Sequence, residues 1–304
     1  MSARFGYCCI NLELQETEGV TCNKTMRKAT FQKKGVEYAS ELSLKNVRGL
    51  ERIIDWNIEK GLKVFRMTSV LFPWASEYRW EELPDIHDIK EVMARSGQKA
   101  LNAGLRLSFH PGPFNCLTSK NPQAVLNCIR DLKIHGDMMD MLGQPRNHWA
   151  KINIHIGGAY GDRPTALARW CKNFDLLPES VKTRLTVEND DRKNLYSTKM
   201  LYDSIYRDLR VPIVFDSHHF ECGPEDVSYE ESLAMAVESW PAGIRPMCHH
   251  SNSKKLYEDD SVNTFAAHSN YYYKPFKDLG YNVDVALEAK AKEKALFKYL
   301  QDFC

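Results

Sequence analysis

Short apolar runs alternate along the chain with longer amphipathic segments. Eight runs have the length and apolar content of buried strands, and they start at residues 5, 63, 105, 151, 184, 211, 244 and 282. The segments between them show helical spacing; in 43–60, apolar residues recur at three- and four-residue intervals, and the pattern stops before Gly61. Alternation of strands and helices predicts a parallel sheet, and eight strands is the number that closes a TIM (β/α)8 barrel. We therefore predict one α/β barrel domain over residues 1–304.

The segment 13–42 interrupts this alternation. It is locally basic, with Lys24, Arg27, Lys28, Lys33 and Lys34. We expect a solvated loop there, and an arm that contacts phosphate groups is the alternative. The whole chain carries 41 Lys and Arg residues against 40 Asp and Glu residues, a net charge of +1. This balance excludes the global basic signature of a nucleic-acid coat.

The composition is that of an ordinary globular protein, with 27% charged and 43% hydrophobic residues. No stretch approaches about 18 uninterrupted apolar residues, so we predict no membrane span, and residues 1–11 lack the long apolar segment of a secretory signal. Nine cysteines, an odd number without a CxxC pair, are typical of reduced thiols. We therefore expect an intracellular protein, in the cytoplasm, the nucleoid or the nucleus.

Six successive predicted strands end in a His, Asp or Glu residue. In chain order these are His110, His155, Glu188, Asp216, His249 and Glu288. The carboxyl ends of barrel strands converge on one mouth, where active sites are built. Imidazoles and carboxylates gathered there would be buried without partners, and divalent metal ions would satisfy them. Mixed nitrogen and oxygen ligands suit Mn, Zn, Fe or Co, and their number predicts about two or three ions, as in phosphoryl-transfer hydrolases.

Four nearby residues are further candidates. His219 follows Asp216 by three residues and can point into the same cleft, whereas we expect His218 to be a supporting or surface residue. His268 lies in a predicted loop. Lys290, two positions beyond Glu288, can contact a phosphate or a metal-bound carboxylate, and a lysine on a helix surface is the alternative.

Several of these stretches resemble the UV damage endonuclease family. They are Phe5-Gly6-Tyr7 with Asn11, Phe65-Arg66-Met67-Thr68-Ser69, Phe109-His110-Pro111, residues 154–160, residues 187–191, residues 214–219, His249-His250-Ser251 and Leu287-Glu288-Ala289-Lys290. The resemblance runs from residue 5 to residue 297 in the family's order. It implies a TIM barrel with a cluster of metal ions, typically manganese, with Mg, Co or Zn as alternatives. The implied reaction is hydrolysis of the phosphodiester immediately 5′ to a UV lesion in double-stranded DNA.

The resemblance also implies roles for particular residues. Its metal ligands are His110, His155, Glu188, Asp216, His219, His249, His268 and Glu288. Glu188 and Glu288, together with Lys290, are the expected catalytic residues. The resemblance places the loop of Pro113 and Phe114 against the damaged nucleotides, and we expect Tyr7 and Asn11 to be its neighbours.

Four positions depart from the family's pattern. Glu77 stands where the family commonly has His, and Met247 stands where it has a Lys close to the metals. Pro113 and Phe114 replace Gln and Tyr. Other interpretations of the sequence are an apurinic-site endonuclease, a sugar isomerase on the same scaffold, or a damage-binding protein that has lost catalysis. The presence of all eight candidate ligands argues against the last of these. A protein partner cannot be predicted from the sequence.

Overall fold

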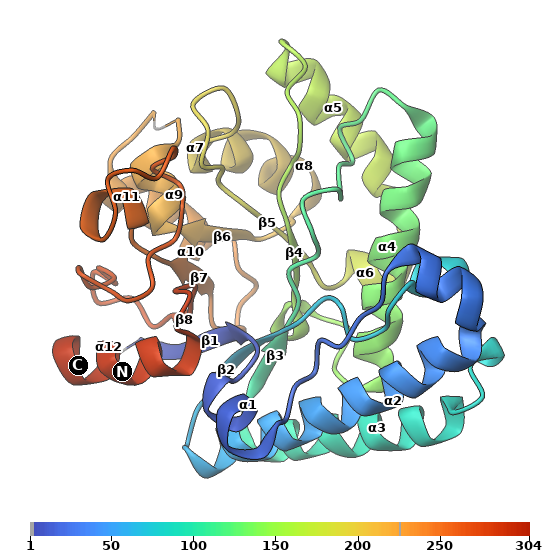
Figure 1. The fold of residues 1–304 in the computed structure, drawn as a ribbon. Coiled ribbons are helices and arrows are strands. Elements are labelled where there is room, and N and C mark those ends of the chain that lie inside the picture. Colours follow the sequence, from blue (N-terminus) through green and yellow to red (C-terminus); the bar gives the residue numbers. More distant parts are fainter. Residues whose placement is uncertain (1–2, 225) are drawn as a thin grey trace.

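The structure, a computed structural model, describes residues 3–224 and 226–304 and is built around eight parallel β-strands (Figure 1). They are β1 (Arg4–Cys9), β2 (Val64–Met67), β3 (Arg106–Ser108), β4 (Ile152–Ile154), β5 (Leu185–Glu188), β6 (Ile213–Asp216), β7 (Met247–His250) and β8 (Asp284–Leu287). Each lies within or next to one of the eight predicted runs. The prediction of eight strands is confirmed.

The strands form one sheet in the order β3-β2-β1-β8-β7-β6-β5-β4. Its two end strands meet at Phe109, which pairs in parallel with Ile152. The Phe109 N–H donates to the Lys151 carbonyl (3.0 Å), and the Asn153 N–H donates to the Phe109 carbonyl (2.9 Å). These bonds bring the sheet into the predicted barrel, and they lie directly before His110.

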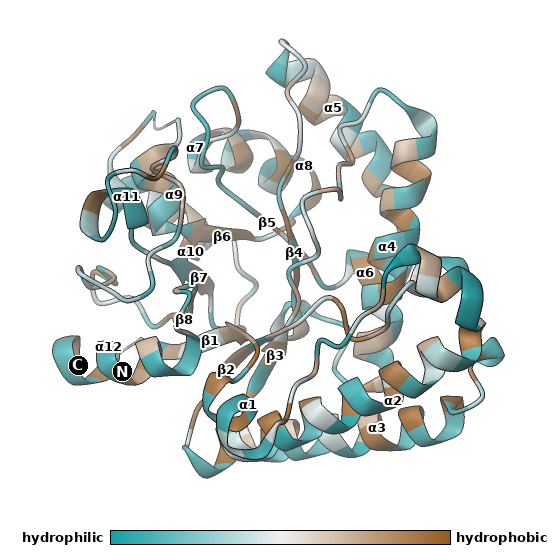
Figure 2. Cartoon of the chain, in the orientation of Figure 1, coloured by the Kyte–Doolittle hydropathy of each residue, from teal (hydrophilic) through white to brown (hydrophobic). Residues whose placement is uncertain are grey.

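Helices surround the sheet, and α2 and α3 run side by side along one flank (Figure 1). The helices are α1 (Leu12–Glu18), α2 (Lys28–Glu59), α3 (Ile86–Ala103), α4 (Pro122–Met141), α5 (Arg163–Phe174), α6 (Glu179–Lys182), α7 (Thr198–Leu201), α8 (Arg207–Leu209), α9 (Ser217–Cys222), α10 (Tyr229–Glu238), α11 (Lys254–Tyr257) and α12 (Lys292–Phe303). Short 3-10 turns are η1 (Ala75–Glu77), η2 (Trp80–Glu82) and η3 (His148–Ala150), and η4 (Tyr202–Tyr206) is a π-helix. Hydrophobic and hydrophilic residues alternate along α2 and α3 in Figure 2, because one face of each packs inward. No helix in the described parts of the chain is long and apolar enough to cross a membrane.

The prediction of a loop over 13–42 is wrong for most of the segment, and only residues 19–27 lack helical structure. This segment forms α1 and the first part of α2, which is kinked at Gly35 (φ 67°, ψ −161°). Tertiary contacts explain the difference: Leu14 is buried in the core, and Phe31 stacks on Trp74 with ring centroids 5.8 Å apart. The five basic residues of the segment remain exposed.

A network of ion pairs fills the amino-terminal end of the barrel. Asp284 is fully buried and accepts hydrogen bonds from Arg4 (2.7 and 2.9 Å) and from Arg106 (3.0 Å). The other N–H groups of Arg106 donate to the carbonyls of His148, Trp149 and Arg245. A buried charge needs both a counter-charge and hydrogen bonds, and this network supplies both for Asp284. The network fills the end of the barrel opposite the strand-end residues.

Candidate metal centre

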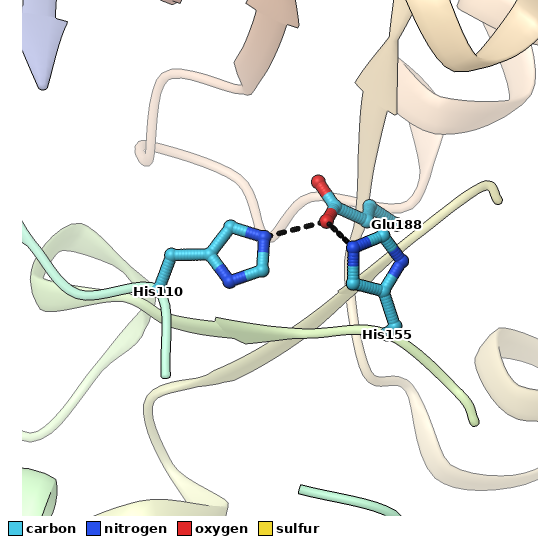
Figure 3. Close-up of side chains that lie close together, drawn as sticks. All are labelled: His110, His155 and Glu188. Carbon is cyan, nitrogen blue, oxygen red and sulfur yellow. Dashed lines mark hydrogen bonds and ion pairs between the residues drawn. The ribbon is translucent and has the colours of Figure 1, made fainter. Parts of the chain in front are cut away.

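Glu188, at the end of β5, lies at the centre of the strand-end residues and is fully buried. Its Oε1 lies 2.6 Å from His110 Nε2 and 2.8 Å from His155 Nε2. Figure 3 shows these two imidazoles, from the ends of β3 and β4, directed at the same carboxylate oxygen. The second oxygen, Oε2, lies 2.9 Å from His249 Nδ1 on β7. Three strand ends therefore meet on one carboxylate.

The remaining candidates lie around His249. Asp216 Oδ2 lies 4.0 Å from His249 Nδ1 and 3.7 Å from His219 Nδ1. Glu288 Oε1 lies 3.1 Å from His249 Nδ1, and Glu288 Oε2 lies 3.9 Å from His268 Nε2. All eight candidate ligands are thus placed at the same end of the barrel.

Neighbouring groups fix the orientation of several ligand side chains. Asp216 caps α9, and its Oδ1 accepts the N–H groups of both His218 and His219 (2.8 and 2.9 Å). His155 Nδ1 lies 2.9 Å from Asp190 Oδ1, and His219 Nδ1 lies 2.9 Å from a backbone carbonyl. Because Nδ1 of His155 and of His219 is held by these partners, Nε2 is the ring nitrogen that each could offer to a metal.

Buried polar atoms without partners test whether metal ions fit. Four atoms of the cluster form no aligned hydrogen bond among residues 3–224 and 226–304. They are Asp216 Oδ2, His268 Nδ1, and the pair Glu188 Oε2 and His249 Nδ1, which lie 2.9 Å apart without hydrogen-bond geometry. Such atoms are costly unless something satisfies them. Two groups of donors have their ligand atoms within 4.8 Å of one another: His110, His155 and Glu188, and Glu188, Asp216 and His249. These donor sets fit divalent cations, and Glu188 belongs to both.

Charges within the cluster shift the pKa values of its members. Burial raises the pKa of Glu188, but the imidazoles of His110, His155 and His249 outweigh burial and hold this pKa well below its ordinary value. Burial lowers the pKa of His155, but the carboxylates of Glu188 and Asp190 outweigh burial and hold this pKa well above its ordinary value. A metal ion that binds His155 must therefore displace a proton, so binding weakens as the pH falls.

Two cations border the cluster, and the sequence analysis missed both as site residues. Arg66 on β2 forms an ion pair with Glu288 through Nη1 and Oε1. Burial raises the pKa of Glu288, but Arg66 and His249 outweigh burial and hold it well below its ordinary value. Lys151 is fully buried, its Nζ lies 3.2 Å from His249 Nε2, and burial lowers its pKa to about 7. The alternation of strand side chains was the available signal, because Lys151 precedes His155 by four residues and so shares its inward face.

The structure shows the surroundings of Met247 and Glu77, two of the positions that depart from the family's pattern. Met247 packs against Val64, Val214 and Trp240 in a small apolar cluster. Position 247 offers no amine, and the amine next to the cluster is that of Lys151, 3.2 Å from His249 Nε2. Glu77 is exposed in η1, and together with Phe114 it lines a pocket of about 350 Å³.

The residues expected at the lesion fall into two groups. Pro113 and Phe114 are exposed on the loop after β3, and Phe114 has 92% of its surface accessible. Tyr7 and Asn11 are buried: the Tyr7 hydroxyl donates to Asn57 (2.8 Å) and accepts from Asn11 Nδ2 (2.9 Å). Asn11 Oδ1 also caps α1. The polar groups of Tyr7 and Asn11 thus have hydrogen-bond partners within the fold and are not accessible to DNA. The expectation that these two residues lie next to the lesion is not supported.

Three other polar residues lie outside the ligand groups. Lys290 is exposed and lines a shallow pocket with Tyr257 and Tyr271, so it lies at the rim. His218 is fully buried and is not a surface residue; its ring lies 5.5 Å from that of His268. His250 faces away from the cluster, toward Ser217 Oγ (2.7 Å), so only one of the adjacent histidines points inward, as predicted.

Comparison with known proteins agrees with this geometry. A family model described as UV-endonuclease UvdE matches residues 3–304. The chain belongs to the UV-endonuclease UvdE family. The UV DNA damage endonuclease of Bacillus thuringiensis subsp. konkukian is 30% identical over 315 residues, which cover 99% of this chain and 95% of that protein. The resemblance seen in the sequence is therefore confirmed.

Solved structures support the same fold. The crystal structure of SacUVDE has a TM-score of 0.83 and 25% identity, and the match covers 99% of this chain and 97% of that one. L-ribulose 3-epimerase has a TM-score of 0.52 and 13% identity over 84% of this chain and 82% of that chain. The second likeness is one of fold alone, since one barrel scaffold supports many chemistries.

Glu188 belongs to both groups of candidate ligands, so its loss should weaken metal binding at both. We expect Glu188→Gln to weaken Mn²⁺ binding by at least about 100-fold, because loss of supporting residues around a metal already costs about 10–100-fold. Isothermal titration of the metal-free protein measures this. Glu179→Gln, an exposed position on α6, is the control and should bind Mn²⁺ like the wild type. Equal affinity of the Glu188→Gln variant and the wild type would contradict the assignment.

Proposed function

We propose that the protein is a metal-dependent DNA repair endonuclease that acts inside the cell on damaged double-stranded DNA. In this proposal it hydrolyses the phosphodiester immediately 5′ to a UV photolesion and leaves a 3′-hydroxyl. The convergence of imidazoles and carboxylates on Glu188 at the mouth of a barrel carries the proposal. Membership of the UV-endonuclease UvdE family supports DNA as the substrate and the lesion as the signal.

The donor sets suit about two or three divalent ions, with Mn²⁺ favoured and Mg²⁺, Co²⁺ or Zn²⁺ as alternatives. His110, His155 and Glu188 would hold one ion, and Glu188, Asp216 and His249 would hold another. Divalent ions bound there supply a water of lowered pKa and neutralise charge on the phosphoryl group.

The chain's own residues prepare this site for an anionic substrate. Glu188 and Glu288 are the proposed catalytic carboxylates; Glu188 joins the two donor groups, and Glu288 is held ionised by Arg66. His219 and His268 complete the donors next to them. Lys290, exposed at the rim, is assigned in this proposal to a DNA phosphate.

Pro113 and Phe114 are the proposed lesion-contacting residues. They lie on the loop that starts at His110, next to the cluster. Pro113 restricts the backbone of this loop, and the exposed Phe114 ring offers a π-face without a hydrogen-bonding group. Such a ring can stack on a base or fill a gap in the duplex, but it cannot read base edges. UV lesions weaken stacking and pairing, so the cost of moving the damaged nucleotides out of the stack is lowest there.

A nicking assay on one defined duplex tests the proposed reaction. The duplex carries a single cyclobutane dimer and a labelled strand, and each divalent metal is added in turn. We expect one cut, immediately 5′ to the dimer, that EDTA abolishes. His110→Ala and Glu288→Gln should each lower the rate by at least about 100-fold and leave the barrel folded, because each removes a metal ligand.

Matched substrates separate the alternatives. Cleavage of an abasic duplex without cleavage of the dimer duplex would indicate an apurinic-site endonuclease instead. Turnover of ketoses without any nicking would indicate a sugar isomerase, and tight binding to the dimer without nicking in any metal would indicate a damage-binding protein. Near-wild-type nicking by both variants under limiting metal would contradict the ligand assignment.

Phe114 predicts an effect on binding that is separate from nicking. Stacking of an aromatic ring on a base contributes roughly 1–3 kcal/mol. Phe114→Ala should therefore weaken binding to the dimer duplex by about 10–100-fold, with a smaller effect on undamaged duplex, whose binding is mainly electrostatic. Its high exposure predicts an unchanged melting temperature. Leu176→Ala, also exposed but on the turn before α6, is the control; an unchanged ratio of the two affinities in Phe114→Ala would contradict the role.

A further inference from the structure

A second exposed aromatic residue, Tyr160, lies on the loop that follows the candidate ligand His155. Tyr160 is on the loop between β4 and α5, which rises to the top of Figure 1 and starts at His155. The side chain is 47% exposed. Its backbone is left-handed, with φ of 53°, a conformation that bulky residues rarely adopt. Glycine or asparagine would fit this turn without strain, so the backbone alone does not explain a tyrosine.

Packing places Tyr160 close to the loop of Phe114. The Tyr160 hydroxyl lies 3.8 Å from Cys116 Sγ, and Cys116 follows Phe114 by two residues. The two loops pack tightly, because a Cβ at Gly157 would lie 2.4 Å from Cys116 Sγ. The two exposed rings are therefore presented by adjacent loops, each of which begins at a candidate metal ligand.

Two cations flank the Tyr160 ring. Lys120 Nζ lies 5.4 Å from the ring centroid, and Arg169 Cζ lies 5.6 Å from it. Arg169 is held by a hydrogen bond from its Nε to the Thr118 carbonyl (2.9 Å), whereas Lys120 is exposed. Within the described residues neither cation forms a salt bridge, but both interact electrostatically with the carboxylate of Asp162, which caps α5. An aromatic face with two nearby positive charges suits a nucleotide, whose base stacks and whose phosphate needs a counter-charge.

We propose that Tyr160, Lys120 and Arg169 form a second DNA contact that stacks one unpaired base and binds the adjoining phosphate. The proposal rests on the proposed function, since a lesion held at the mouth leaves bases out of the stack. The base displaces Lys120 from the ring, and the released ammonium joins Arg169 on the phosphate. The strain at position 160 is kept because it projects the ring from the loop toward DNA.

Two substitutions at Tyr160 test the ring and the backbone separately. Asparagine tolerates the left-handed conformation but has no ring, and phenylalanine keeps the ring without the hydroxyl. Affinities are measured in EDTA, which prevents nicking, for a dimer duplex and for the matched undamaged duplex. Tyr160→Asn should bind the dimer duplex roughly 10–100-fold more weakly than the wild type, with a smaller loss on undamaged duplex, while Tyr160→Phe should stay within about 2-fold. Lys120→Gln should reduce the salt dependence of binding by about one counterion.

Leu279 provides a matched control, since it is also left-handed (φ 51°) and 46% exposed, but it lies before β8 at the opposite end of the barrel. Leu279→Asn removes a similar left-handed, half-exposed side chain and should leave both affinities unchanged. Retained binding by Tyr160→Asn, or equal losses in Tyr160→Asn and Tyr160→Phe, would overturn the stacking contact. If the wild type binds both duplexes equally, the proposed function and this contact are overturned together. If the wild type prefers the dimer duplex and Tyr160→Asn keeps the same affinity, this contact alone is overturned.

Discussion

The buried carboxylate of Glu188 is the constraint on which the site depends. An ionised carboxylate inside a barrel is unfavourable unless opposite charges surround it. Here the imidazoles of His110, His155 and His249 approach its two oxygens from three other strands. The bridge that closes the barrel, at Phe109, lies next to His110. The contact that closes the sheet is therefore adjacent to the donor set.

Charged side chains also line the barrel interior beneath the candidate metal centre. At the closed end, Asp284 is paired with Arg4 and Arg106. Next to the cluster, Arg66 pairs with Glu288, and Lys151 lies against His249. Each of these cations lies beside an anion or a candidate ligand, and so the interior can tolerate an acidic mouth that could hold metal ions.

The parts of this structure that follow from local rules could be predicted from the sequence. Periodicity gave the eight strands, and the convergence of strand ends gave His110, His155 and Glu188 as neighbours. The helices within 13–42 could not be predicted, because their apolar contacts, such as Phe31 on Trp74, are non-local. The burial of Asn11 also depends on geometry that the sequence hides: β1 ends at Cys9 in a left-handed conformation, and the chain then turns into α1. Lys151 could not be predicted from the strand ends, because it lies one residue before β4 on the inward face that it shares with His155.

Anomalous diffraction from crystals of the manganese-loaded protein tests the central claim most directly. Data recorded at the manganese absorption edge locate the ions without reference to activity. The account predicts one peak among His110, His155 and Glu188, and a second among Glu188, Asp216 and His249, so that Glu188 contacts both. Peaks elsewhere on the chain, with none in contact with Glu188, would contradict it.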